Sequence, residues 1–112
     1  SNMINATIYV NSRHAYMGFD LEGHAGYSEA GTDIVCAAVS VLVINTINAV
    51  EMYTEDQMNC VTDEENGMIS FRFDREPSHD AQLLVKTMIL GLESMSDNSE
   101  YEPYIDIIFE EV

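Results

Sequence analysis

A long apolar segment in the first half of the chain constrains the fold more than any other feature. From Asp33 to about Glu51 the sequence predicts a helix, with Thr32 or Asp33 as the N-cap. Apolar residues fall on nearly every side of it, at Ile34, Val35, Val39, Val41, Leu42, Val43, Ile44, Ile47 and Val50. A helix that is apolar all round is buried on most sides. We therefore expect this helix to lie between a sheet and a second layer, such as another subunit.

Two segments with alternating apolar residues precede this helix and predict a β-hairpin. The first strand is expected over Met3–Asn11, and the second runs from Ala15 to Glu22 after a short turn at Asn11–Arg13. The residues expected to face inward are Ile4, Ala6, Ile8 and Val10 from the first strand, and Ala15, Met17, Phe19 and Leu21 from the second. The second strand ends at Gly23-His24.

The rest of the chain predicts three more strands and a second helix. Short strands are expected at Gln57–Thr62 and Met68–Asp74, joined by a turn that contains Asn66-Gly67. Ser78 is the expected N-cap of a helix that ends near Met95. A last strand is expected over Tyr104–Phe109, with its inward residues at Ile105, Ile107 and Phe109.

The predicted order is β-β-α-β-β-α-β, which indicates an α+β fold with two helices and a mostly antiparallel sheet. Residues 1–112 are long enough for one domain with a single core, and we expect one domain. Ser1 and Asn2 precede Met3 and are interpreted as the remnant of a cleaved tag.

The charge of the chain limits its partners. Twenty acidic residues and four basic ones give a formal net charge of −16. Such a field repels nucleic acid and anionic membrane surfaces and attracts cationic proteins. Solubility or a salty habitat would explain the same composition. No apolar run is expected to reach the length of a membrane span, so we expect a cytoplasmic protein without a membrane partner, whose two cysteines are free thiols.

Cys36 and His24 form a candidate catalytic pair. Cys36 lies three residues into the predicted helix, where the helix dipole favours the reactive thiolate. The simpler interpretation is that this cysteine only packs in the core. His24 stands twelve residues earlier at the end of a strand and is the usual kind of base for a cysteine nucleophile. A solvated or structural histidine is the alternative.

Other residues near this pair suggest supporting roles. Asp33 either caps the helix or orients the imidazole, as the third member of a triad does. Ser40, one turn after Cys36, either hydrogen-bonds near the thiol or bonds back to its own helix. Gly23, Gly26 and Gly31 predict a mobile loop over Ala25–Gly31 that opens for a substrate, although three glycines also suit tight turns.

The sequence gives no reason to expect a metal or a cofactor. The histidines and cysteines show no CxxC or HxxxH spacing, and no phosphate-binding loop or dinucleotide fingerprint is present; the residues considered are His14, His24, His79, Cys36 and Cys60. Cys60 falls in a predicted strand, and we expect it in the core.

Residues 23 to 40 resemble the signature of the ribosomal-processing cysteine protease family. The matching positions are Gly23-His24-Ala25-Gly26-Tyr27, Gly31, Asp33, Cys36-Ala37-Ala38 and Ser40. The resemblance implies that His24 is the base and Cys36 the nucleophile, with Asp33 and Ser40 in support. It also implies an α+β homodimer that removes the N-terminal extension of large-subunit ribosomal protein twenty-seven during ribosome maturation. The rival interpretations are a non-catalytic ribosome-assembly factor that binds a basic ribosomal protein, and a small thioesterase-like hydrolase.

Overall fold

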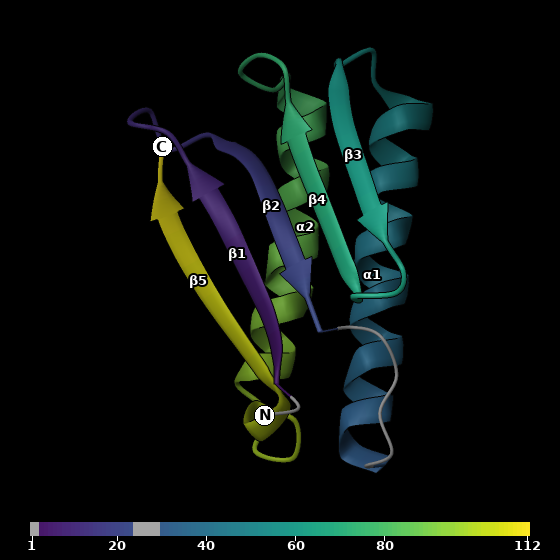
Figure 1. The fold of residues 1–112 in the computed structure, drawn as a ribbon. Helices are drawn as coiled ribbons and strands as arrows, with labels where there is room; N and C mark the ends of the chain where they lie inside the picture. Colours follow the sequence, from purple (N-terminus) through teal and green to yellow (C-terminus); the bar gives the residue numbers. More distant parts are fainter. Residues whose placement is uncertain (1–2, 24–29) are drawn as a thin grey trace.

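The computed structural model describes residues 3–23 and 30–112, which form one sheet covered on one face by two helices (Figure 1). In chain order the elements are β1 (Ile4–Val10), β2 (Tyr16–Glu22), α1 (Ala30–Tyr53), β3 (Met58–Asp63), β4 (Met68–Phe73), α2 (His79–Ser96), a short 3₁₀ helix (Glu102–Tyr104) and β5 (Ile105–Glu111). The predicted α+β order is confirmed, and the strand bounds differ from the prediction by one or two residues.

The sheet has the strand order β3-β4-β2-β1-β5. Neighbouring strands are antiparallel except for β1 and β5, which are parallel. Helices α1 and α2 lie side by side on the same face (Figure 1). They pack closely because Gly91 of α2 has no side chain, and a Cβ there would lie 2.7 Å from Leu42 Cδ2 of α1.

The core lies between this sheet face and the two helices. Its strand side includes Ile4, Ala6, Ile8, Phe19, Leu21, Ile69, Phe71, Phe73 and Ile105, and its helix side includes Val35, Val39, Val43, Val50, Ala81, Val85, Met88, Ile89 and Leu92. Ser78 caps α2 as predicted, since its hydroxyl accepts a hydrogen bond from the N–H of Ala81 at 3.2 Å. The core therefore contains Ile4, Ala6 and Ile8 of the first strand and Ile105 of the last, as expected from their alternation.

The inward face of β2 differs from the prediction because the hairpin contains a β-bulge. Val10 is paired with Tyr16, whereas Tyr9 is paired with Gly18, so Met17 is an extra residue in β2. One extra residue reverses which side chains face inward beyond it. Tyr16 consequently packs against the core in place of Met17.

Helix α1 also differs from the prediction in its start and in its burial. It begins at Ala30, so Asp33 lies in the first turn and is not the N-cap. Within one chain, only its sheet-facing side is buried. Its outer side exposes large apolar residues, namely Ile34, Val41, Ile44, Met52 and Tyr53.

By length and composition, α1 contains one stretch apolar enough to cross a membrane, Asp33–Tyr53. The expectation that no run reaches this length is therefore wrong. The inner side of the same stretch contributes Val35, Val39, Val43 and Val50 to the core against the sheet. This packing explains the apolar residues on the inner side of α1 as those of a core helix, whereas those on the outer side are exposed.

Phe109 is a further correction. It was expected to face inward, and its position in β5 is opposite the buried Ile8 of β1. Its side chain is nevertheless 47% exposed, because β5 is an edge strand. Its ring lies 6.4 Å from that of Tyr16, centroid to centroid.

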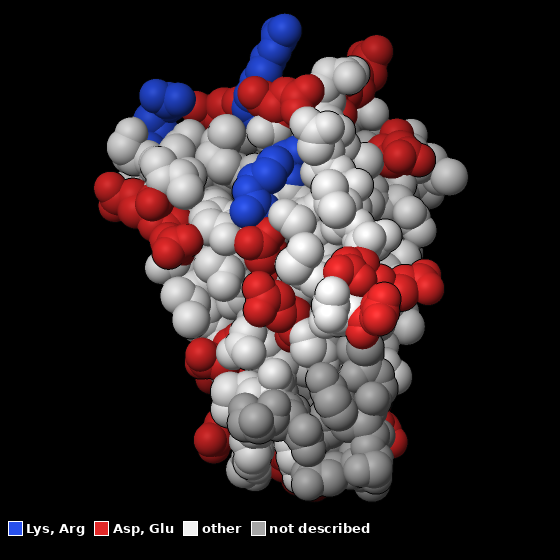
Figure 2. Space-filling model, in the orientation of Figure 1, with Lys and Arg blue, Asp and Glu red and all other residues white. Residues whose placement is uncertain are grey.

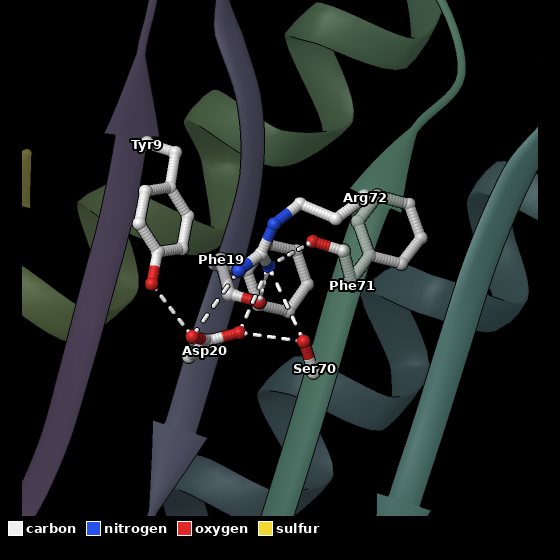
Figure 3. A network of polar contacts seen from close by, with 6 residues as sticks. All are labelled: Tyr9, Phe19, Asp20, Ser70, Phe71 and Arg72. Carbon is white, nitrogen blue, oxygen red and sulfur yellow. Dashed lines mark hydrogen bonds and ion pairs between the residues drawn. The ribbon is translucent and has the colours of Figure 1, made fainter. Parts of the chain in front are cut away.

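The open face of the sheet carries a cross-strand polar network around Asp20 (Figure 3). Arg72 donates from Nη1 and Nη2 to the two oxygens of Asp20 at 2.8 and 3.2 Å. The hydroxyls of Tyr9 and Ser70 donate to the same carboxylate at 2.6 and 2.7 Å. The guanidinium of Arg72 also lies 4.1 Å from the centre of the Tyr9 ring. Partial burial raises the pKa of Asp20, but hydrogen bonds from Arg72, Tyr9 and Ser70 outweigh it and hold this pKa below its ordinary value.

We expect Asp20→Asn to lower the free energy of unfolding at pH 7 by about 1–2 kcal/mol, allowing for solvent screening of the partly exposed Arg72. Because the folded-state pKa of Asp20 is lowered, its contribution is present above the unfolded pKa of about 4 and is lost as pH falls through the folded pKa. Urea unfolding should therefore give a difference in the free energy of unfolding between variant and wild type that is smaller at pH 2 than at pH 7. Asp106→Asn, an exposed position on β5, is the control and should change little. An Asp20→Asn difference of equal size at both pH values would contradict this prediction.

Candidate active site

Cys36 lies on the sheet-facing side of α1 and is part of the core. The residue is only 7% exposed and belongs to the main apolar cluster. It is the seventh residue of α1, whereas the sequence placed it three residues into the helix. The effect of a helix dipole falls off within the first turn. The start of α1 is therefore not sufficient on its own to make Cys36 a thiolate.

The surroundings of Cys36 favour the neutral thiol. Burial raises the pKa of this thiol, a hydrogen bond from Ser40 lowers it, and the charge of Asp33 raises it, so that the net pKa lies above the ordinary value. A cysteine in this state needs a base to take its proton when it attacks a substrate.

Asp33 and Ser40 lie one turn before and one turn after Cys36 on α1. Asp33 is exposed in the first turn, where a carboxylate interacts favourably with the positive end of the helix. Ser40 is partly buried, and a hydrogen bond from its side chain lowers the pKa of the Cys36 thiol. Both side chains thus act on the charge of Cys36, in opposite directions.

His24 lies outside the described residues, as do Ala25, Gly26 and Tyr27 of the sequence signature. The described chain reaches Gly23 at the end of β2 and resumes at Ala30, the first residue of α1. These two ends lie at the same end of the molecule (Figure 1). Gly31 is a residue of α1, so the predicted loop over Ala25–Gly31 is too long at its C-terminal end.

Gly23 is required by the backbone where β2 ends. Its φ is +84°, a left-handed value that disfavours other residues, and a Cβ there would lie 2.9 Å from the Met3 carbonyl oxygen. Its N–H donates to the Gly67 carbonyl at 3.0 Å. Gly23, which directly precedes His24, therefore lies close to the Met3 carbonyl and is hydrogen-bonded to the β3–β4 turn.

Cys60 was predicted to lie in the core, and this prediction is wrong. It lies on edge strand β3 and is exposed, on the wall of a pocket of about 300 Å³ that Ile44 and Met68 also line. Desolvation raises the pKa of its thiol, and the charge of Glu51 adds to this. Both cysteines are free thiols. In the part of the chain that the structure describes, no group of three His, Cys, Asp or Glu side chains is placed to hold a metal ion.

The chain is similar to known ribosomal processing proteases. The family described as cysteine protease Prp matches residues 3–106. The ribosomal processing cysteine protease Prp of Bacillus subtilis is 35% identical over 97 residues, which cover 83% of this chain and 87% of that protein. The protein of the same name from Staphylococcus aureus strain Mu50 is 30% identical over 95 residues, covering 85% of this chain and 90% of that protein.

Solved structures agree with this relationship. A crystal structure of an essential ribosomal processing protease Prp from S. aureus, in complex with a substrate peptide, aligns with a TM-score of 0.89 at 28% identity, covering 96% of this chain and 100% of that chain. Another crystal structure of Prp from S. aureus, with a covalently linked product peptide, aligns with a TM-score of 0.85 at 29% identity, again covering 96% of this chain and 100% of that chain. The family match spans nearly the whole chain, and the chain therefore belongs to the cysteine protease Prp family.

Proposed function

We propose that this cysteine protease removes the N-terminal extension of large-subunit ribosomal protein twenty-seven in the cytoplasm, with Cys36 as the nucleophile and His24 as the general base. The observation that carries the proposal is Cys36 itself. It lies on α1, burial raises the pKa of its thiol, a hydrogen bond from Ser40 lowers that pKa, and it falls within the residues that match the cysteine protease Prp family. The S. aureus Prp solved with a substrate peptide supports a peptide substrate here.

The reaction follows from the protonation state of Cys36. His24 takes the thiol proton as Sγ attacks the carbonyl carbon of the scissile bond, and it then gives that proton to the leaving amine. Water, activated by the same imidazole, hydrolyses the resulting thioester. The N–H groups at residues 30–32 are the proposed donors to the oxyanion, because the first N–H groups of a helix have no acceptor within it. Ser40 lowers the pKa of the Cys36 thiol through a hydrogen bond, and the charge of Asp33 raises it.

The alternatives are less well supported. A ribosome-assembly factor without catalysis would have no use for a thiol with this hydrogen bond, and relatives in the family are named proteases. A thioesterase-like hydrolase uses the same dyad on another acyl group. Cleavage of an extended precursor, compared with hydrolysis of a thioester of the same acyl sequence, separates these two activities.

We further propose that the exposed apolar side of α1 forms a homodimer interface. Large apolar residues are exposed along this helix at Ile34, Val41, Ile44, Met52 and Tyr53, of which Val41 is 69% and Met52 74% exposed. Exposed apolar side chains along one long helix are typical of a subunit contact. Sedimentation equilibrium tests this interpretation, and a monomer at micromolar concentration would overturn it.

The charges are unevenly placed along the molecule. The Lys and Arg residues on the face seen in Figure 2 lie in its upper half, whereas acidic residues occur in both halves. The lower half contains the end of β2 and the start of α1 (Figure 1). Glu22 and Asp106 both pair in register with Asn5 at this lower end of the sheet. A basic ribosomal protein would therefore be attracted most strongly to the end that carries the proposed active site.

We expect kcat/KM on a full-length basic precursor to fall as salt rises, because the screening length shrinks from about 10 Å at 0.1 M to about 3 Å at 1 M. A short neutral peptide that spans the cleavage site should respond much less. The double variant Glu22→Gln/Asp106→Asn should lower kcat/KM on the precursor several-fold at low salt. The matched double variant Glu110→Gln/Glu111→Gln removes equal charge at the other end of the sheet and should have a smaller effect. If kcat/KM fell equally with salt for the precursor and the peptide, the acidic surface would serve solubility or a salty habitat and would play no part in substrate capture.

A further inference from the structure

A pocket of about 300 Å³ lies between α1 and the edge strand β3. Ile44 and Ile47 of α1 and Met68 and Ile69 of β4 supply the apolar part of its lining, and Thr62 of β3 forms part of its wall. Figure 1 shows β3 running alongside this part of α1. A pocket with this lining suits a large apolar side chain better than a charged one.

The pocket lies on the same side of α1 as Cys36. Cys36, Ser40, Ile44 and Ile47 follow one another at intervals of four, four and three residues, which keeps them on one side of the helix. Leu42 lies on a different side, which faces α2. The eight residues from Cys36 to Ile44 correspond to about 12 Å along the helix axis. An extended peptide covers this distance with about four residues.

The strand beside the pocket has a free edge. β3 is the outermost strand on its side of the sheet and pairs with β4. In that ladder, the Gln57 carbonyl accepts a hydrogen bond from the N–H of Asp74 at 3.0 Å. Because hydrogen-bonded and non-hydrogen-bonded pairs alternate between antiparallel strands, the backbone N–H and C=O groups of Cys60 and Thr62 point away from β4. These are the groups to which an extended peptide adds as a further strand.

Acidic side chains lie around the pocket. Glu64 lines it, and the charge of Glu51 acts on the thiol of Cys60, whose pKa it helps to raise. Among the described residues, no Lys or Arg lines the pocket. The surroundings therefore attract a peptide that carries basic residues next to its apolar one.

We propose that this pocket and the free edge of β3 bind an extended segment of the protein substrate, with a large apolar side chain in the pocket about four residues from the scissile bond. The inference rests on the proposed protease function. The backbone of the segment pairs with β3, its apolar side chain enters between Ile44 and Met68, and the segment continues along α1 past Ser40 to Cys36. The first turns of α1 extend beyond the β3–β4 turn, so this path leads toward the end of the molecule where β2 ends (Figure 1). At Cys60 only backbone atoms take part.

Thr62→Phe tests the pocket by filling it from its β3 wall. It should lower kcat/KM on a short peptide that spans the cleavage site by roughly ten- to hundredfold, mainly through a higher KM, which is the usual effect of losing the burial of one large apolar side chain. Val61→Phe is the matched control, because Val61 is the next residue on the same strand, is exposed, and points to the opposite face of the sheet. This control should keep the wild-type kcat/KM. Circular dichroism checks that both variants are folded.

A series of cleavage-site peptides locates the residue that enters the pocket. Each large apolar residue is replaced by Ser in turn, and kcat/KM is measured with the wild type and with Thr62→Phe. In the wild type, the largest loss should come from the residue about four positions from the scissile bond. In Thr62→Phe the same replacement should have little effect, because a pocket that is already filled cannot lose that contact.

Labelling of Cys60 in the Cys36→Ala protein measures binding without cleavage. The peptide should slow modification of Cys60 by iodoacetamide in a saturable way, because it covers the pocket wall on which this thiol lies. If the wild type cleaves the peptide but Thr62→Phe matches Val61→Phe and Cys60 is not protected, the inference is wrong and the protease function stands. If Cys60 is protected without peptide as protein concentration rises, a second copy covers the pocket and the inference is also wrong. Absence of cleavage by the wild type would remove the proposed function, and this inference with it.

Discussion

Cys36→Ala is expected to reduce cleavage of an extended ribosomal precursor to the uncatalysed background, because it removes the only atom proposed to attack the scissile carbonyl. Cys36→Ser should be equally inactive, since a hydroxyl is a far weaker nucleophile than a thiol that passes its proton to an imidazole. Precursor cleavage is followed by intact mass, and circular dichroism checks that each variant is folded. Both variants change few atoms in the core, so the fold should remain.

Cys60→Ala is the control for this experiment. Cys60 is exposed on β3, away from the core position of Cys36, and its removal should leave kcat unchanged. Full activity in the Cys36→Ala protein would end the protease interpretation for this site.

His24→Ala is expected to lower kcat by roughly 10²–10⁴-fold, the usual contribution of general-base catalysis. The pH profile gives the more specific test. Because the pKa of Cys36 is raised, few thiolates form at neutral pH without a base. The variant should therefore regain activity only as pH rises above about 8.5, the ordinary thiol value.

The double variant Cys36→Ala/His24→Ala should be no less active than Cys36→Ala, because residues that act as one unit are not additive. A His24→Ala protein with wild-type kcat at pH 7 would show that another group serves as the base.

Much of the fold could be predicted because local pattern and tertiary packing agree. The alternation in β1, the Asn66-Gly67 turn and the Ser78 cap each specify one structure, and the structure contains all three. The bulge at Met17 could not be predicted, because a single extra residue in a strand leaves the alternation intact on either side and is seen only in the pairing with β1.

The start of α1 and the exposure of its outer side were missed for different reasons. Gly31 and Thr32 have low helix propensity, and Asp33 is a good N-cap, so the sequence favoured a later start. The apolar residues on nearly every side indicated burial, but a single chain provides a covering layer on one side only. The apolar residues left exposed on α1 are those of the proposed homodimer interface.

The candidate site was predicted through the spacing of its residues more than through their environment. Cys36 and Ser40 are one turn apart in any helix, so their proximity follows from the sequence once the helix is assigned. The raised pKa of Cys36 comes from burial and from the charge of Asp33, and burial depends on how the helix packs against the sheet, which spacing alone does not give.

The most direct test of the account is a comparison of two thiol reagents on the same protein. Iodoacetamide should modify Cys60 before Cys36, because Cys60 is exposed, Cys36 is 7% exposed, and desolvation raises the pKa of both thiols. A peptide chloromethyl ketone with the sequence that precedes the cleavage site should reverse this order, because it occupies the substrate site next to Cys36. Peptide mapping by mass spectrometry gives both rates at pH 7. The account predicts preferential labelling of Cys36 by the peptide reagent and its loss in His24→Ala; the same order of labelling with both reagents would contradict it.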